Sequence, residues 1–284
     1  MKRFDRVLLA SDFDNTLVDT QGAIDAGIDI PPLCARNRAA LEYFIENGGL
    51  FSVSTGRALA AFRAYAAGLP LNAPCVIANG AALYDFGTER YLRTRFFTDE
   101  IYACMDDILA RFPGIGLEVY HDDRRIHAMH VNDYIRSHQH LTRAPAQVVD
   151  EFRAVELPIV KVLFEEDTPY LETVRDYILS RPWSAGYETV FSSPHLLELT
   201  VRGATKGAMV LELASILGVA RDDLYCIGDH GNDLPMLEVS AVPFAPANCI
   251  PAVLESGATI VCSAAAGAIA DVVERLDARY AKQR

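Results

Sequence analysis

Acidic side chains follow two short apolar runs of the sequence. Asp12 and Asp14 come after the run Val7-Leu8-Leu9-Ala10, and Asp229 and Asp233 come after a similar run near the other end of the chain. On an extended segment Asp12 and Asp14 point to the same side, so they can face one substrate and serve as nucleophile and proton carrier. Carboxylates alone also suit a hard, oxygen-liking cation such as Mg²⁺.

A hydroxyl and an ammonium group are available to the same site. Ser54-Thr55-Gly56-Arg57 follows the apolar run Leu50-Phe51-Ser52-Val53, and Lys206 opens a pattern of helical spacing. Ligands of an open α/β sheet bind at the carboxyl edge of its strands, so these groups can converge with the acids. The simplest ligand for a bound cation, Thr55 and Lys206 together is a phosphoryl group.

The segments that must position these residues alternate between strands and helices. In the first part of the chain, strand-like and helix-like patterns alternate at 7–10, 35–47, 50–53, 58–67 and 75–78. The alternation returns later, with a helix from 206, strands at 224–227, 241–244 and 259–261, and a last helix carrying Ile269, Val272, Leu276 and Tyr280. This pattern predicts an α/β fold with a doubly wound, mainly parallel, Rossmann-like sheet.

The middle of the chain has a different composition and a different order of helices and strands. Residues 85–195 hold six of the seven histidines and mix helical patterns with strands in no regular alternation. We therefore expect a second, α+β domain inserted into a core formed by residues 1–84 and 196–284. The length of 284 residues agrees with two domains of ~150 residues each.

Four ordered motifs of the sequence resemble those of the haloacid dehalogenase superfamily of phosphohydrolases. They are Asp12-Phe13-Asp14-Asn15-Thr16, Ser54-Thr55-Gly56-Arg57, Gly203-Ala204-Thr205-Lys206-Gly207 and Gly228-Asp229-His230-Gly231-Asn232-Asp233. Asn79-Gly80-Ala81 and Glu198 are similar to the Cof-like branch, in which a large α/β cap lies between the second and third motifs. The resemblance covers essentially the whole chain.

The resemblance implies a role for each motif. Asp12 would attack phosphorus and form an aspartyl-phosphate, while Asp14 would protonate the leaving oxygen and then activate water. The phosphate-binding residues that it implies are Thr55, Gly56, Lys206 and Asn232. The implied Mg²⁺ cofactor would be held by the Asp12 carboxylate, the Asp14 backbone carbonyl and Asp229, with Asp233 as a further ligand or a support. Asn15 stands where glycine is commoner, and we expect little consequence because asparagine tolerates a left-handed backbone.

We therefore expect a Mg²⁺-dependent phosphatase that hydrolyses a small phosphorylated metabolite, such as a sugar phosphate. A phosphomutase of the same superfamily would share every core residue. A non-catalytic phospho-receiver module or regulatory binding protein is a further alternative, although a receiver is about half this length and lacks a large insert.

Composition narrows the range of partners. The chain has 38 acidic and 26 basic residues and a net charge of −12, which argues against nucleic acid and anionic membranes as partners. No run reaches the ~20 apolar residues of a membrane span, and no obligate protein partner is evident. Six scattered cysteines without a CxxC pair indicate free thiols and a cytoplasmic location.

The histidines of the insert come in pairs, His127 with His130 and His138 with His140. Neither pair has the HExxH pattern of a zinc helix, so we interpret them as surface or cap-core residues. One histidine can line the substrate cleft, and His127 and His130 are candidates for that place. The pair Glu165-Glu166 is interpreted as part of a solvated face.

Overall fold

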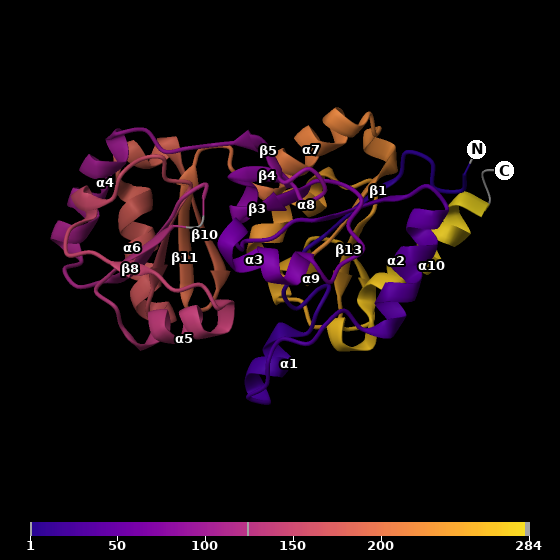
Figure 1. Cartoon of the computed structure of the whole chain (residues 1–284), viewed down its shortest axis with the longest axis horizontal. Helices are drawn as coiled ribbons and strands as arrows, with labels where there is room; N and C mark the ends of the chain where they lie inside the picture. The colour runs from indigo at the N-terminus through magenta and orange to yellow at the C-terminus, as the bar shows by residue number, and fades with distance from the viewer. Residues whose placement is uncertain (1, 124, 282–284) are drawn as a thin grey trace.

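The computed structural model describes residues 2–123 and 125–281. The chain forms two lobes, a core that contains both ends of the described chain and a cap built from its middle (Figure 1). Among the described residues, no helix has the length and apolar character needed to cross a membrane.

The core is built on a parallel sheet of five strands in the order β14-β13-β12-β1-β2. Its strands are β1 (Leu8–Ser11), β2 (Leu50–Val53), β12 (Leu224–Ile227), β13 (Pro243–Pro246) and β14 (Thr259–Val261). β1 lies inside the sheet between β12 and β2, and its four residues are all buried, as a parallel strand covered on both faces requires. The predicted parallel sheet is confirmed, and the strand expected at 241–244 lies two residues later.

Helices cover both faces of this sheet. Leu9 and Phe51 face α2 (Ala35–Glu46), α3 (Leu59–Ala66) and α10 (Ala268–Ala281). Leu8 and Cys226 face α7 (Lys206–Leu217), α8 (Leu234–Val239) and α9 (Pro251–Glu255). A short helix, α1 (Thr20–Asp25), projects from the core lobe beside the mouth of the site described below (Figure 1).

The strand expected at 75–78 belongs to a different sheet. β3 (Cys75–Ile77) meets β2 through a single bridge between Ser54 and Val76, and it pairs antiparallel with β4 (Ala82–Asp85). β4 in turn pairs with β5 (Arg90–Thr94). The chain reverses between β3 and β4 because residues 78–80 all adopt positive φ, and this turn converts a sixth parallel strand into the start of a hairpin.

The cap is a six-stranded sheet in the order β10-β11-β9-β6-β7-β8. Its strands are β6 (Gly116–Tyr120), β7 (Ile126–Met129), β8 (Gln147–Val148), β9 (Lys161–Glu165), β10 (Tyr187–Ser193) and β11 (Leu196–Val201). α4 (Glu100–Arg111) and α6 (Thr168–Ser180) pack on one face through an apolar cluster. α5 (Asp133–Thr142) contacts the other face, which is turned toward the core.

Strand pairing supports limits for the cap that differ from 85–195. β5 pairs only within the β3-β4-β5 sheet, while β11 pairs with β9 and β10 of the cap. A sheet is completed by hydrogen bonds between strands, so a strand belongs to the domain in which it pairs. We propose that the cap comprises residues 96–201.

Candidate active site

Asp12 lies at the carboxyl end of β1 and is 6% exposed. Its carboxylate accepts a hydrogen bond from Lys206 Nζ over 2.6 Å, and the same ammonium group donates to Asp233 Oδ1 over 2.6 Å. Lys206 begins α7, where the Thr205 hydroxyl caps the helix by accepting from Ala208 N. The cap and the first helical turn therefore fix the lysine between two acids that are far apart in sequence.

The buried acids carry more negative charge than Lys206 can neutralise. Burial and the nearby Asp233 carboxylate raise the pKa of Asp12 well above its usual range, despite the ammonium group. Burial and Asp233 likewise raise the pKa of Asp229 to about 7. Burial alone would lower the pKa of Lys206, but Asp12 and Asp233 outweigh that effect and raise it. The arrangement favours a further cation beside the carboxylates.

Asp12, Asp229 and Asp233 are the residues placed to hold that cation. One carboxylate oxygen from each lies within 4.8 Å of the others. Asp229 Oδ1 accepts from the Thr16 hydroxyl over 2.7 Å, and Asp233 Oδ2 accepts from the backbone N–H groups of Asp229 and His230 over 2.9 and 3.0 Å. An all-oxygen donor set of this kind fits Mg²⁺, which binds through few protein carboxylates and keeps several waters.

Asp14 faces a different set of partners. Arg57 holds its carboxylate with two hydrogen bonds of 2.8 Å, from Nε and Nη2, and the Thr20 hydroxyl donates over 2.6 Å. Although burial opposes ionisation, the Arg57 guanidinium and these hydrogen bonds lower the pKa of Asp14. Asn15, the next residue, has φ 55°, which confirms the left-handed backbone expected there.

The predicted phosphate-binding residues come from three segments; Gly56 and Asn232 line the cavity described next, whereas Thr55 and Lys206 are buried and absent from its lining. Thr55 is fully buried, and its hydroxyl accepts from Arg57 N over 3.1 Å. Asn232 donates from Nδ2 to Asn79 Oδ1 over 2.9 Å. A Cβ at Gly56 would lie 3.2 Å from both Asn79 and Glu198, so the glycine lets these side chains close on the loop.

A cavity of about 660 Å³ opens between the core and the cap above these residues. Asp12, Asp14, Gly56, Asp229 and Asn232 line it from the core. The cap side consists of strands β6, β9 and β11, helix α5, and the end of β10 with the turn that follows it, and it includes Tyr120, His138, Leu141, Lys161, Leu163, Ser193, His195 and Glu198. The volume lies in the range of small-molecule sites.

Sequence reasoning missed several residues of this site. Lys161 is 3% exposed and joins the cap to Gly56, while Thr20 and Asn79 contact predicted site residues directly. The sequence did not decide whether Arg57 contacts the substrate or a carboxylate of the core, and in the structure it pairs with Asp14. The sequence does hold a signal for Lys161, which lies inside the apolar run 159–164. Burial of a charged lysine costs free energy, so a lysine in such a run indicates a specific partner or function.

The cap histidines are placed differently from the expectation. His127 bonds to the buried His121 over 2.9 Å, and His130 Nδ1 contacts the Ile115 carbonyl oxygen. The cap histidines that line the cavity are His138 and His195, and His230 lines it from the core. Glu165 is fully buried, so its interpretation as part of a solvated face is wrong; the strand β9 turns it toward His138.

The fold and the cavity define a class of protein, an α/β phosphohydrolase with an inserted cap. The chain belongs to the haloacid dehalogenase-like hydrolases, whose family model matches residues 9–273. It is 24% identical to the 5-amino-6-(5-phospho-D-ribitylamino)uracil phosphatase YwtE of Bacillus subtilis (strain 168), over 94% of this chain and 97% of that protein. The protein is accordingly a phosphoric monoester hydrolase.

Solved structures share the whole fold, including the cap. A haloacid dehalogenase-like hydrolase from Bacteroides thetaiotaomicron matches with a TM-score of 0.80 and 21% identity, over 95% of this chain and 99% of that chain. The HAD subclass IIB sugar phosphatase BT4131 matches with a TM-score of 0.78 and 17% identity, over 95% and 98%. These likenesses establish the arrangement of the two domains as a shared fold.

Proposed function

We propose that the protein is a Mg²⁺-dependent phosphatase that hydrolyses a small phosphorylated metabolite through an aspartyl-phosphate on Asp12. The observation that carries the proposal is the position of Lys206, which bridges Asp12 and Asp233 by hydrogen bonds of 2.6 Å beside Asp229. Three buried carboxylates with one ammonium group form a site for a cation and a phosphoryl group together.

The residues of the acid cluster fit the metal that this chemistry uses. Asp12, Asp229 and Asp233 would hold Mg²⁺, and the backbone carbonyl of Asp14 is proposed as a fourth donor. When bound, the cation neutralises charge on the phosphoryl oxygens and fixes their orientation toward Asp12. Lys206 offsets part of the repulsion between Asp12 and the other acids, and a bound cation would add to this effect and favour the ionised nucleophile.

The proposed reaction divides into two displacements at phosphorus. In the first, an Asp12 carboxylate oxygen forms a bond to phosphorus, the bond to the leaving oxygen breaks, and that oxygen takes a proton from Asp14. Asp14 must therefore carry a proton in the substrate complex, where the negative phosphoryl group opposes the effect of Arg57 on its pKa. In the second, a water molecule attacks the phosphorus of the aspartyl-phosphate and gives a proton to Asp14. The bond between phosphorus and Asp12 then breaks, which releases phosphate and restores both carboxyl groups.

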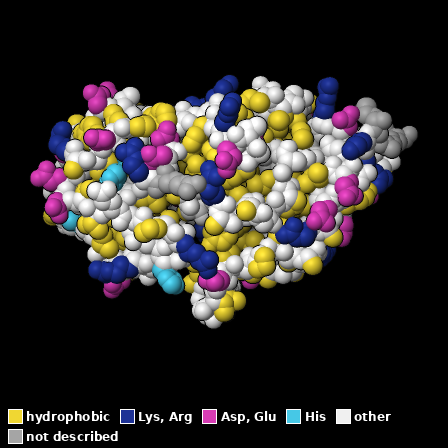
Figure 2. All heavy atoms as spheres, viewed as in Figure 1, with side chains coloured by type: hydrophobic (Ala, Val, Ile, Leu, Met, Phe, Trp, Pro, Cys, Tyr) yellow, Lys and Arg dark blue, Asp and Glu magenta, His cyan; other side chains and the backbone are white. Residues whose placement is uncertain are grey.

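The proposed substrates are phosphomonoesters with a carbohydrate or polyol leaving group. The relative YwtE is named for a phosphoribitylamino-uracil, and the structural relative BT4131 is named a sugar phosphatase. The cavity of about 660 Å³ has room for a leaving group of this size above the acid cluster. The cytoplasmic location and the lack of nucleic-acid, membrane and obligate protein partners stay predictions from composition. Lys and Arg are interspersed with Asp and Glu on the face shown in Figure 2.

The test is turnover of p-nitrophenyl phosphate and of a panel of sugar and polyol phosphates, with and without Mg²⁺. We expect Asp12→Asn to remove essentially all release of phosphate while the thermal melting curve stays that of the native fold. Substantial turnover by a clean Asp12→Asn preparation would exclude the covalent route. An isomerised phosphoester in place of free phosphate, seen by phosphorus NMR, would point to the phosphomutase alternative.

A further inference from the structure

The cap presents an unusual row of charged residues to the cavity. Glu118 on β6, Leu163 on β9 and Glu198 on β11 are register partners, and Tyr120 is the partner of Lys161. Residues in register point to the same face of a sheet, so these side chains share the face that the cap turns toward the core. Glu118, Lys161 and Glu198 are 1–3% exposed. Charges buried this deeply persist only when they are matched by partners.

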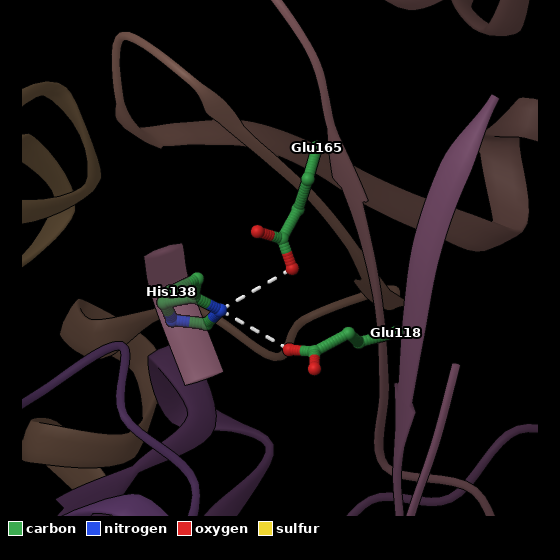
Figure 3. Close-up of side chains that lie close together, drawn as sticks. All are labelled: Glu118, His138 and Glu165. Atoms are coloured by element: carbon green, nitrogen blue, oxygen red, sulfur yellow. Dashed lines mark hydrogen bonds and ion pairs between the residues drawn. The ribbon is translucent and has the colours of Figure 1, made fainter. Parts of the chain in front are cut away.

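His138 of α5 lies against this face between two carboxylates (Figure 3). Its Nδ1 is 3.1 Å from Glu118 Oε2 and 3.2 Å from Glu165 Oε1. Both glutamates come from adjacent strands of the cap sheet, so the ring is oriented by the sheet itself. With Nδ1 used in this way, the Nε2 edge of the ring is the part left for the cavity that His138 lines.

The two carboxylates favour an imidazolium over the neutral ring. Burial alone would lower the pKa of His138, but the hydrogen bonds and charges of Glu118 and Glu165 outweigh it and raise the pKa to about 9. Near neutral pH both ring nitrogens of His138 are then donors. Nδ1 donates to the glutamates, and Nε2–H is available to a ligand.

The same contacts argue against a metal ion at this cluster. Glu118 Oε2 already accepts from the Tyr120 hydroxyl over 2.5 Å, and Glu118 Oε1 accepts from Gln139 Nε2 over 2.8 Å. A carboxylate with both oxygens occupied by donors is a hydrogen-bonded counter-ion. His138, Glu118 and Glu165 thus form an ion-pair cluster that positions a donor.

The other cations of the cavity are also matched by carboxylates. Lys161 Nζ lies 3.1 Å from Glu198 Oε2, and Arg57 is paired with Asp14. Below them, Lys206 is shared by Asp12 and Asp233. Within the described residues, 2–123 and 125–281, every lysine and arginine that lines the cavity has an acid partner. The Glu118–His138–Glu165 cluster adds no excess positive charge. A second anionic group on the substrate would find no counter-charge here.

We propose that His138 is a specificity-determining residue whose Nε2–H donates a hydrogen bond to an oxygen of the leaving group, and that the cavity selects phosphomonoesters whose leaving group is uncharged and hydroxylated. Glu118 and Glu165 are the positioning residues. The inference rests on the proposed phosphatase activity and adds the charge class of its substrate.

The test uses two acyclic substrates that differ mainly at one end. Sorbitol 6-phosphate ends in a neutral CH₂OH group, and 6-phosphogluconate ends in a carboxylate. We expect the wild-type kcat/KM for sorbitol 6-phosphate to exceed that for 6-phosphogluconate by about tenfold or more, because an unpaired anion must be desolvated to enter. Equal values, or a preference for the carboxylate, would overturn the charge selection.

The role of His138 is tested by His138→Ala, with His140→Ala as the matched control, since His140 is an exposed residue of the same helix. We expect His138→Ala to lower kcat/KM for sorbitol 6-phosphate about tenfold or more, as loss of a hydrogen bond from a charged group does. The value for p-nitrophenyl phosphate should change by less than about threefold. An equal loss on both substrates would assign His138 a structural role only.

A measurement on the wild-type protein keeps the proposal open to refutation if His138→Ala unfolds the cap. The His138 imidazole ¹⁵N resonances should shift when sorbitol is added together with inorganic phosphate, and shift less with phosphate alone. Identical spectra under the two conditions would remove His138 from the leaving-group site. If no phosphomonoester is turned over, p-nitrophenyl phosphate included, the proposed function fails, whereas turnover without these selective effects refutes only the present inference.

Discussion

Lys161 of the cap donates a hydrogen bond from Nζ to the backbone carbonyl oxygen of Gly56 in the core, over 2.9 Å. The same ammonium group lies 4.7 Å from the centroid of the Tyr120 ring and pairs with Glu198. Gly56 belongs to the loop that we propose to hold phosphate. The position of the cap and the geometry of that loop are therefore connected through Lys161.

Substitution of Lys161 should loosen this junction. We expect Lys161→Met to lower kcat/KM for every phosphomonoester about tenfold or more, because the Glu198 carboxylate loses its buried partner and the loop loses a cap contact. Arg125→Met removes an exposed cap cation and serves as the control. Steady-state kinetics with a thermal melt for each variant checks the expectation. Comparable kinetics for Lys161→Met and Arg125→Met would show that the contact has no part in turnover.

Arg57→Lys should affect substrates according to their leaving groups. The guanidinium holds both oxygens of Asp14, and a lysine cannot reproduce this two-pronged geometry. We expect a loss of about 10²-fold in kcat/KM on alkyl phosphates, where Asp14 must supply a proton. The loss on p-nitrophenyl phosphate should be smaller, because nitrophenolate leaves without protonation.

Arg63→Lys is the matched control for this comparison. Arg63 lies on α3, the helix that follows Arg57 in the sequence, and it pairs with the exposed Glu89. Arg63→Lys should leave kcat/KM for both substrates within about twofold of the wild-type values, as expected for an exposed ion pair. If Arg57→Lys lowers kcat/KM for the two substrates by the same factor, Arg57 does not act through Asp14.

Removal of the metal should abolish turnover. We expect EDTA to stop release of phosphate and Mg²⁺ to restore it, while Ca²⁺ fails because its larger, looser coordination misplaces the reacting groups. Asp229→Asn should raise the Mg²⁺ concentration for half-maximal activity by more than about tenfold, since one charged ligand is lost. Asp222→Asn, at an exposed acid before β12, is the control. Full activity after exhaustive chelation would contradict the prediction.

The His138 cluster should make stability depend on pH in a definite direction. The pKa of His138 is about 9 in the folded protein and near 6.5 for the free side chain. The folded state therefore binds a proton more tightly, and its stabilisation is fully present below pH 6.5 and is lost as the pH rises through 9. The side chain is 14% exposed, so the effect on the free energy of unfolding is roughly 1–3 kcal/mol.

Urea denaturation between pH 6 and pH 9.5 measures this effect. The wild-type protein should lose more stability across that interval than Glu165→Gln, in which one of the two carboxylates that retain the proton on His138 is neutral. Glu166→Gln changes the next residue, which is part-exposed, and should follow the wild-type curve. Parallel curves for the wild type and Glu165→Gln would show that His138 is not held in its charged form by this cluster.

The core of the site was predictable because its residues end local patterns. Asp12 and Asp229 close apolar runs of four residues, and Lys206 begins a helix behind a capping threonine. Each signal lies within about ten residues of sequence, and the parallel sheet then brings the strand ends to one edge. Such signals predicted all five strands of the parallel sheet and placed the acids at its carboxyl edge.

The cap side of the cavity was not predictable in this way. Lys161 meets Gly56 across 105 residues of sequence, and Glu118 meets His138 across 20. No local periodicity reports such contacts, since the first depends on how the cap faces the core and the second on how α5 packs on the cap sheet. The available clue was a charged residue within each apolar segment: Glu118 inside β6, Lys161 at the start of β9 and Glu198 inside β11. The strand at 75–77 touches β2 through only one parallel bridge and belongs instead to the β3-β4-β5 sheet, because the left-handed backbone of Ala78 and Asn79 turns the chain back into β4.

The position of β1 between β2 and β12 has a consequence for synthesis of the chain. Leu8 pairs with Leu50 on one side and with Leu224 on the other. A chain emerging from the ribosome can form the first pairing early, but the second must wait until the whole cap has been made. Until then one edge of β1 is open to pairing with other chains. The cap strands have all their partners within residues 116–201, so the cap can complete its sheet before β12, β13 and β14 have been made.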